Sequence, residues 1–117
     1  MIFMSLTGGT LSLYYIGCVG QKEPDWGPTL VRLAWHSSGT YDKIKKNGGS
    51  GGGTIRFKEE LAHGGNAGLS DTAVKWLEPI HAKYEADGLS YADLYTLAGG
   101  KSLVFGNSVL VSTFGID

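Results

Sequence analysis

The chain has 117 residues, which is enough for one domain and too few for two. Its 42% hydrophobic and 18% charged residues exclude a disordered chain, and its single cysteine, Cys18, excludes an internally disulfide-bonded secreted scaffold. A net charge of -1 provides no electrostatic case for binding nucleic acid or an anionic membrane, so neither partner is expected.

The charged residues are unevenly distributed and predict three parts of the chain. No charged side chain occurs in residues 1–21 or 102–116. We therefore expect a divergent N-terminal segment over residues 1–25, a folded domain over 26–100 and an unrelated tail over 101–117. The first segment is mildly apolar, is interrupted by Ser, Thr and Gly, and lacks a positively charged flank. We expect it to be an ordinary buried or frayed segment, with a targeting or anchoring role as the alternative.

The first helix is predicted from Trp26 to His36, with Pro28 suited to the first turn. Helical spacing places Leu30, Leu33 and Ala34 on one apolar face. This face is expected to lie in the core.

A different face of the same helix carries three chemically distinctive residues. Arg32 and His36 are four residues apart, and Trp35 lies at the edge of their face. A merely solvated face is one interpretation. The functional interpretation is favoured because tryptophan is costly to leave in water and because arginine and histidine are unusual choices for filling a surface beside it.

A long loop follows the first helix. Its lysines, in residues 43–46, are expected to form a solvated face. The glycine run over residues 48–53, interrupted only by Ser50, does not match a phosphate-binding G-x-G-x-x-G between a strand and a helix. A tight, permissive loop is therefore predicted rather than a phosphate cradle.

Two more helices complete the predicted all-α middle of the chain. The second is predicted over Leu69–Tyr84, with Pro79 expected to bend or restart it, and the third opens with a capping box at Ser90. The tail at 103–114 is rich in β-forming residues, with Gly106 in a turn signal, and predicts a short hairpin. The apolar stripe of the second helix consists of Leu69, Ala73, Trp76, Leu77, Ile80 and Tyr84.

Five motifs in order resemble the haem peroxidases. They are LVRLAWHSSGTYDK, GGSGGGTIRF, HGGNAGL, WLEPI and LSYADLYTLAG, and they fall between residues 26 and 99. The R-L-A-W-H motif, with a tryptophan before its histidine, resembles that of the intracellular class I branch of the family. This branch contains ascorbate peroxidase, cytochrome c peroxidase and catalase-peroxidase. The resemblance implies a partial haem-peroxidase helical domain made of the distal helices.

The resemblance implies a function as well as a fold. The family uses haem b to reduce hydrogen peroxide, with electrons from a small donor such as ascorbate or from cytochrome c, in the response to oxidative stress. It also implies an intracellular protein, with the cytosol, plastid and mitochondrion all open. Lys22 and its neighbours match the donor-site lysine of the ascorbate-using relatives only imperfectly, so the donor stays open.

The matching residues would form the distal side of the haem pocket. His36 would be the distal acid–base that moves a proton between the two peroxide oxygens, and Arg32 would stabilise the negative charge that develops. Trp35 would lie over the haem, donate its N–H and exclude water. Asn66 would hydrogen-bond the other nitrogen of His36 and fix its tautomer.

The family also requires a proximal histidine that ligates the iron, usually held by a carboxylate. No histidine follows His81 in this sequence, so no metal ligand is predicted here. We therefore expect a truncated product or fragment with weak or absent haem affinity, an exposed apolar surface and a tendency to aggregate. A non-catalytic pseudo-peroxidase or interaction module is the alternative function.

The remaining candidate features are expected to be unrelated to catalysis. His63 and His81 are predicted to be surface histidines. The segment GGKS at residues 99–102 is similar to the end of a phosphate-binding P-loop, but Tyr95 stands where the motif needs glycine and the segment before it is helical rather than extended.

Overall fold

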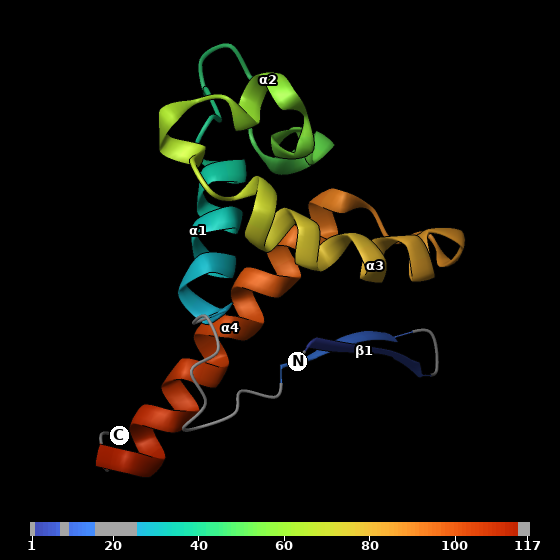
Figure 1. The fold of residues 1–117 in the computed structure, drawn as a ribbon, viewed down its shortest axis with the longest axis vertical. Helices are drawn as coiled ribbons and strands as arrows, with labels where there is room; N and C mark the ends of the chain where they lie inside the picture. Colours follow the sequence, from blue (N-terminus) through green and yellow to red (C-terminus); the bar gives the residue numbers. More distant parts are fainter. Residues whose placement is uncertain (1, 8–9, 16–25, 115–117) are drawn as a thin grey trace.

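The structure is a computed structural model that describes residues 2–7, 10–15 and 26–114, with side chains described from 26 to 103. The rest of the predicted N-terminal segment, including Cys18, lies outside the described residues. Within them the chain is mostly helical (Figure 1). The predicted all-α class is confirmed for the middle of the chain.

Two long helices form the centre of the fold. Helix α1 spans Trp26–Ser38 and helix α4 spans Tyr91–Phe114, and the two pack against each other. Their crossing is close because Gly99 has no side chain: a Cβ placed there would lie 2.5 Å from the Cβ of Ala34. The glycine therefore sets how near the two helix backbones can approach.

Helix α4 begins as the sequence predicts. The backbone N–H of Asp93 donates to Ser90 Oγ at 3.1 Å, and the Ser90 hydroxyl donates to Asp93 Oδ2 at 2.6 Å. The serine thus satisfies one of the N–H groups that the first turn of a helix leaves free.

The second predicted helix has an irregular start. A π-helical turn over Ser70–Val74 leads into helix α3, Lys75–Tyr84, and the N–H of Val74 donates to the carbonyl of Leu69 at 3.0 Å. Of the two outcomes expected at Pro79, a bend or a restart, the restart is wrong, because α3 continues through the proline. Pro79 stands in the second turn of α3 and lacks only the N–H that would reach the carbonyl of Lys75, at the helix's first residue.

The predicted hairpin in the tail is also wrong. Residues 103–114 extend α4 without interruption. A helix that has already been started and capped gains a backbone hydrogen bond with each added residue, whereas an isolated hairpin is marginal in water. The turn signal at Gly106 does not outweigh that cooperativity.

A two-stranded hairpin occurs instead near the N-terminus. Strands β1, Ile2–Thr7, and β2, Thr10–Tyr15, pair antiparallel with Ile2 opposite Tyr15 and Thr7 opposite Thr10. The alternating apolar residues of this segment would have indicated it. Strand β2 contacts α4.

The core lies between α1, α3 and α4. Ile55, from the turn after the glycine run, is fully buried in it. Gly53 has a positive φ, and a Cβ there would lie 2.6 Å from the Cβ of Tyr91, so this glycine lets the loop pack on α4. None of the helices in the described residues is long and apolar enough to cross a membrane. The buried apolar residues are Leu30, Leu33, Ile55, Leu69, Ala73, Leu77, Tyr84, Leu89, Leu94, Tyr95 and Ala98.

Candidate functional site

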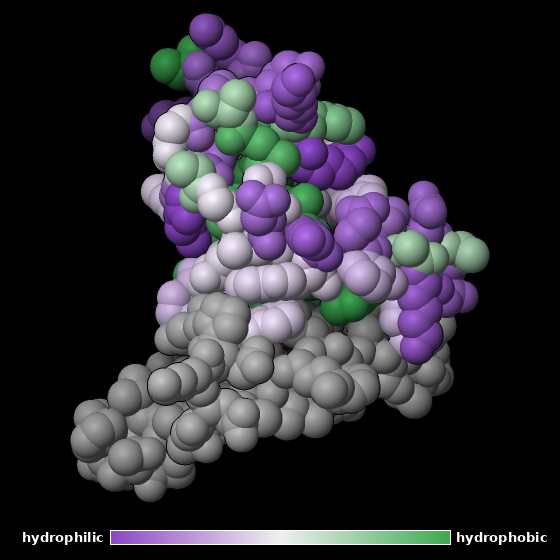
Figure 2. Space-filling model, in the orientation of Figure 1, coloured by the Kyte–Doolittle hydropathy of each residue, from purple (hydrophilic) through white to green (hydrophobic). Residues whose placement is uncertain are grey.

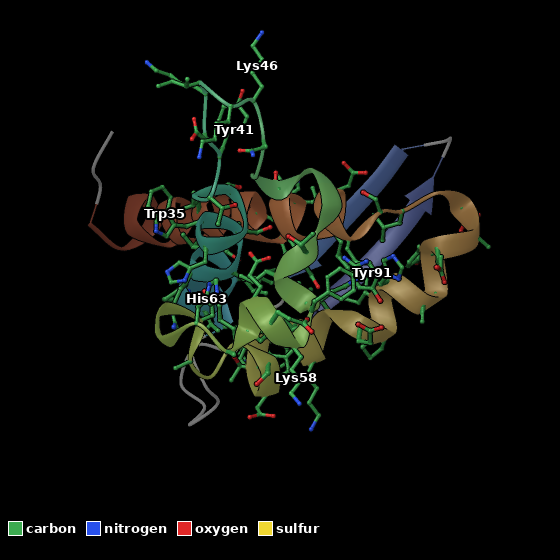
Figure 3. All side chains as sticks on the ribbon, turned by 90° about the horizontal axis from the view of Figure 1, so that it is seen from above. Trp35, Tyr41, Lys46, Lys58, His63 and Tyr91 are labelled. Atoms are coloured by element: carbon green, nitrogen blue, oxygen red, sulfur yellow. The ribbon has the colours of Figure 1, made fainter. Side chains whose placement is uncertain are left out.

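The candidate site lies on the face of α1 that points away from this core. Leu30 and Leu33 are buried on the inner face, as predicted, while Trp35 on the outer face is 67% exposed. Arg32 and His36 are half-buried beside it. Figure 3 shows Trp35 on α1 with the His63 loop nearby.

The loop that follows the short helix α2, Lys58–Leu61, holds the side chain of His36 in place. The Nδ1 of His36 lies 2.8 Å from the Oδ1 of Asn66, the pair that the family resemblance implies. The Nδ2 of Asn66 donates to the backbone carbonyl of Glu60 at 2.9 Å. Asn66 itself is buried, with 7% of its surface exposed.

These two hydrogen bonds fix the tautomer of His36. The Glu60 carbonyl can only accept, so the amide nitrogen of Asn66 must face it and the amide oxygen must face His36. The oxygen can only accept in turn, so Nδ1 carries the proton of the neutral ring. Nε2, on the other side of the ring, is then left with its lone pair.

The same loop fixes the orientation of Arg32. One of its guanidinium nitrogens donates to the backbone carbonyls of Gly65 at 2.5 Å and Ala67 at 3.1 Å. These carbonyls flank Asn66, so residues 65–67 hold the arginine through the backbone and the histidine through a side chain. The sequence alone could not predict these two partners of Arg32, because every residue has a backbone carbonyl.

The other two histidines have different positions. His63 is exposed in the loop, as predicted. His81 was expected at the surface, but it is 5% exposed and stacks on the ring of Tyr91 with centroids 3.5 Å apart. The signal was available, because position 81 follows Leu77 by one helical turn on the buried stripe.

A second polar cluster surrounds Tyr91. Its hydroxyl donates to Glu78 Oε1 at 2.6 Å, and the guanidinium of Arg56 lies 4.4 Å from its ring centroid. The hydrogen bond to Glu78, followed by burial, raises the pKa of Tyr91 to about 12. Burial raises the pKa of Tyr95 well above its usual range. The cluster joins three segments of the chain and contains no residue of the candidate site.

The outer face of α1 is chemically suited to one side of a haem. Trp35 offers an exposed aromatic surface, and His36 offers an oriented imidazole nitrogen beside the fixed charge of Arg32. No group of three or more His, Cys, Asp or Glu side chains in the described residues could hold a metal ion. Haem carries its own iron and needs only single axial ligands from protein, so a cluster of that kind is not required.

Comparisons with known proteins show the family of this chain. A family model described as Peroxidase matches residues 17–113, which extends past both ends of the predicted 26–100 domain. The mitochondrial cytochrome c peroxidase of Aspergillus fumigatus is 58% identical over 77 residues, covering 66% of this chain and 20% of that protein. The probable L-ascorbate peroxidase 4, peroxisomal, of Oryza sativa subsp. japonica is 54% identical over 72 residues, covering 62% and 23%.

A solved structure shares the fold. The TL29 protein from Arabidopsis thaliana matches with a TM-score of 0.67 and 34% identity, over 79% of this chain and 38% of that chain. This chain spans about a fifth of the length of the first curated relatives. It belongs to the peroxidase family, with cytochrome c peroxidases and an ascorbate peroxidase of the class I type among its relatives.

Proposed function

We propose that this chain forms the distal face of the catalytic site of a haem peroxidase that reduces hydrogen peroxide. The observation that carries the proposal is the hydrogen bond between His36 and Asn66, made beside Arg32 and Trp35 on one helix face. Haem b would supply the redox chemistry when bound, with Trp35 and His36 against its distal face.

In this proposal His36 is the general acid–base. Its Nε2 lone pair takes the proton from one oxygen of hydrogen peroxide and returns it to the other oxygen as that oxygen leaves. Asn66 keeps Nδ1 protonated, so that Nε2 stays available for the first transfer.

Arg32 and Trp35 would assist the same step. The guanidinium of Arg32 stays charged at any working pH, and its backbone contacts with the 65–67 loop hold that charge near His36, where it stabilises negative charge on the departing oxygen. The indole of Trp35 would donate its N–H to bound peroxide and keep bulk water away from it.

The names of the relatives support a proposal for the electron donor and the location. We propose either ascorbate or cytochrome c as the donor, since curated relatives are named for each. We also propose peroxide removal within a cell, since those relatives are named as mitochondrial or peroxisomal.

A second candidate is a non-catalytic module with the peroxidase fold. It is favoured by the positions of the chain's three histidines. His36 is committed to the distal face, His63 lies in the same loop as Asn66, and His81 is stacked in the core. In this second candidate none of the three would ligate the iron of a haem, so the chain would not reduce peroxide by itself.

Peroxide consumption by the haem-loaded chain separates the two candidates. The purified chain is supplied with haem, with imidazole as the opposite axial ligand and with ascorbate or reduced cytochrome c as donor. Replacing the acid–base in His36→Leu should lower the rate by about 10²–10⁴. The matched variant His63→Leu should leave it unchanged. No consumption above that of free haem by the unaltered chain would favour the non-catalytic module, and an equal loss in both variants would refute the role of His36.

A further inference from the structure

The loop that follows α1 presents lysines and apolar side chains together at one end of the molecule. Figure 1 shows it extending beyond the C-terminal end of α1. Lys43, Lys45 and Lys46 are exposed, and Ile44 between them is 86% exposed. Tyr41, at the base of the loop, is 59% exposed. Figure 2 shows a hydrophobic surface set among hydrophilic ones at this end.

The shape of the loop is fixed by its own hydrogen bonds. The N–H of Asp42 donates to the carbonyl of Asn47 at 2.9 Å and closes the turn. The Oδ1 of Asp42 accepts the backbone N–H groups of Ile44 at 2.8 Å and Lys45 at 3.1 Å. Since the loop is held in this shape without a partner, little conformational entropy remains to be lost when it binds.

The charge of the loop is left uncompensated. Asp42 is the one acidic residue between Tyr41 and Asn47, and its carboxylate is directed at the backbone of the turn. None of the acidic side chains in the described part of the chain forms an ion pair with the three lysines. The overall charge of -1 conceals this local excess of positive charge, because the acidic residues lie elsewhere.

We propose that this loop, residues 41–47, docks on a membrane surface that carries anionic phospholipids. The lysines would bind the headgroup phosphates, and Ile44 would enter the boundary between headgroups and acyl chains. Tyrosine favours the same boundary, where Tyr41 would lie. This inference does not depend on the proposed peroxidase activity.

A membrane fits the loop better than an acidic protein surface does. A protein would need an apolar pocket for Ile44 ringed by carboxylates at matching positions. A lipid interface accepts an aliphatic tip anywhere, and lysine stems can extend from the apolar boundary to the charged headgroups.

Sedimentation with vesicles tests the proposal on the full chain. The unaltered chain should bind vesicles of phosphatidylcholine with phosphatidylserine more tightly than vesicles of phosphatidylcholine alone, and added salt should weaken the binding. Changing the three loop lysines to glutamine should reduce partitioning on the order of 100-fold. Ile44→Asn should reduce it by about 10-fold.

A second triple variant is the matched control. Lys58, Lys75 and Lys101 are also exposed but lie on other elements, and Figure 3 places Lys58 on the opposite side of the molecule from Lys46. Changing them to glutamine removes the same charge and should leave partitioning nearly unchanged. Circular dichroism checks that every variant keeps its helix content.

Five results would overturn the proposal. Four of them are no binding to either vesicle, equal binding to both, equal losses in the two triple variants, and binding that is insensitive to the loop variants. The fifth is a loss with the loop lysines but not with Ile44→Asn, because binding would then depend on charge alone and Ile44 would not enter the membrane.

Discussion

The close crossing of α1 and α4 predicts that two neighbouring glycines respond in opposite ways to the same substitution. A Cβ at position 99 would lie 2.5 Å from the Cβ of Ala34 and 3.4 Å from the carbonyl oxygen of Leu30, whereas a Cβ at Gly100 has nothing within 4 Å. Both neighbours of position 99 are held by helix backbone, so neither can rotate away. Gly99→Ala therefore requires the helices to separate.

The expected change in the free energy of unfolding follows from two opposing effects of the added methyl group. Alanine favours a helix over glycine by about 1 kcal/mol, and this gain applies at both positions. Overpacking a tight contact costs about 1–3 kcal/mol, and this cost applies only at position 99. Gly100→Ala should raise the free energy of unfolding by up to about 1 kcal/mol. The free energy of unfolding of Gly99→Ala should be about 1–3 kcal/mol lower than that of Gly100→Ala.

Urea unfolding followed by far-ultraviolet circular dichroism measures both values. Adding Ala34→Gly to Gly99→Ala removes the clashing methyl group and should recover most of the loss after the cost of a glycine in α1 is subtracted. Equal effects of Gly99→Ala and Gly100→Ala would show that the helices do not cross closely at position 99.

Substitutions at three further positions test the site, the helix cap and the tyrosine cluster. Asn66→Ala removes the partner of both His36 Nδ1 and the Glu60 carbonyl and should lower the free energy of unfolding by about 1–3 kcal/mol; an unchanged urea midpoint would contradict the burial of this pair. Ser90→Ala should cost about 1 kcal/mol by removing the cap of α4, and Ser90→Gly only a few tenths, so equal losses would refute the cap. For Tyr91, the pKa of about 12 lies above the usual 10.0, so the unfolded chain loses this proton first as pH rises. The stability that this pKa difference contributes is fully present below pH 10.0 and is lost as pH rises through about 12. Over this pH range the urea midpoint should fall less steeply with pH for Tyr91→Phe than for the unaltered chain. Parallel plots of urea midpoint against pH would contradict the hydrogen bond to Glu78.

Helical periodicity and local end signals were sufficient to predict where the three longer helices in the middle of the chain lie. Leu30 and Leu33 are buried and Ser90 caps α4, because those features depend on residues within a few positions of each other. The tail was mispredicted because its β-forming residues follow a helix that is already established. His81 is buried although histidine is polar, because its spacing from Leu77 places it on the buried stripe of α3.

The site was predictable in its residues but not in how they are held. The motif identified His36, Arg32 and Asn66, and the structure brings them together as the resemblance implied. Their catalytic roles stay predictions. The backbone carbonyls that orient Arg32 could not be predicted, because they belong to a loop 33 to 35 residues away along the chain. The Glu60 carbonyl that orients Asn66 is only six residues away, but its direction depends on the conformation of the turn between them.

The central claim is that the outer face of α1 and the 65–67 loop form one side of a haem site. A haem titration of the purified chain with imidazole present, followed at the Soret band, tests it most directly. We expect a saturable band whose position or affinity changes in His36→Leu and stays the same in His63→Leu. Identical titrations for all three proteins, or a spectrum of free haem that never saturates, would contradict the claim.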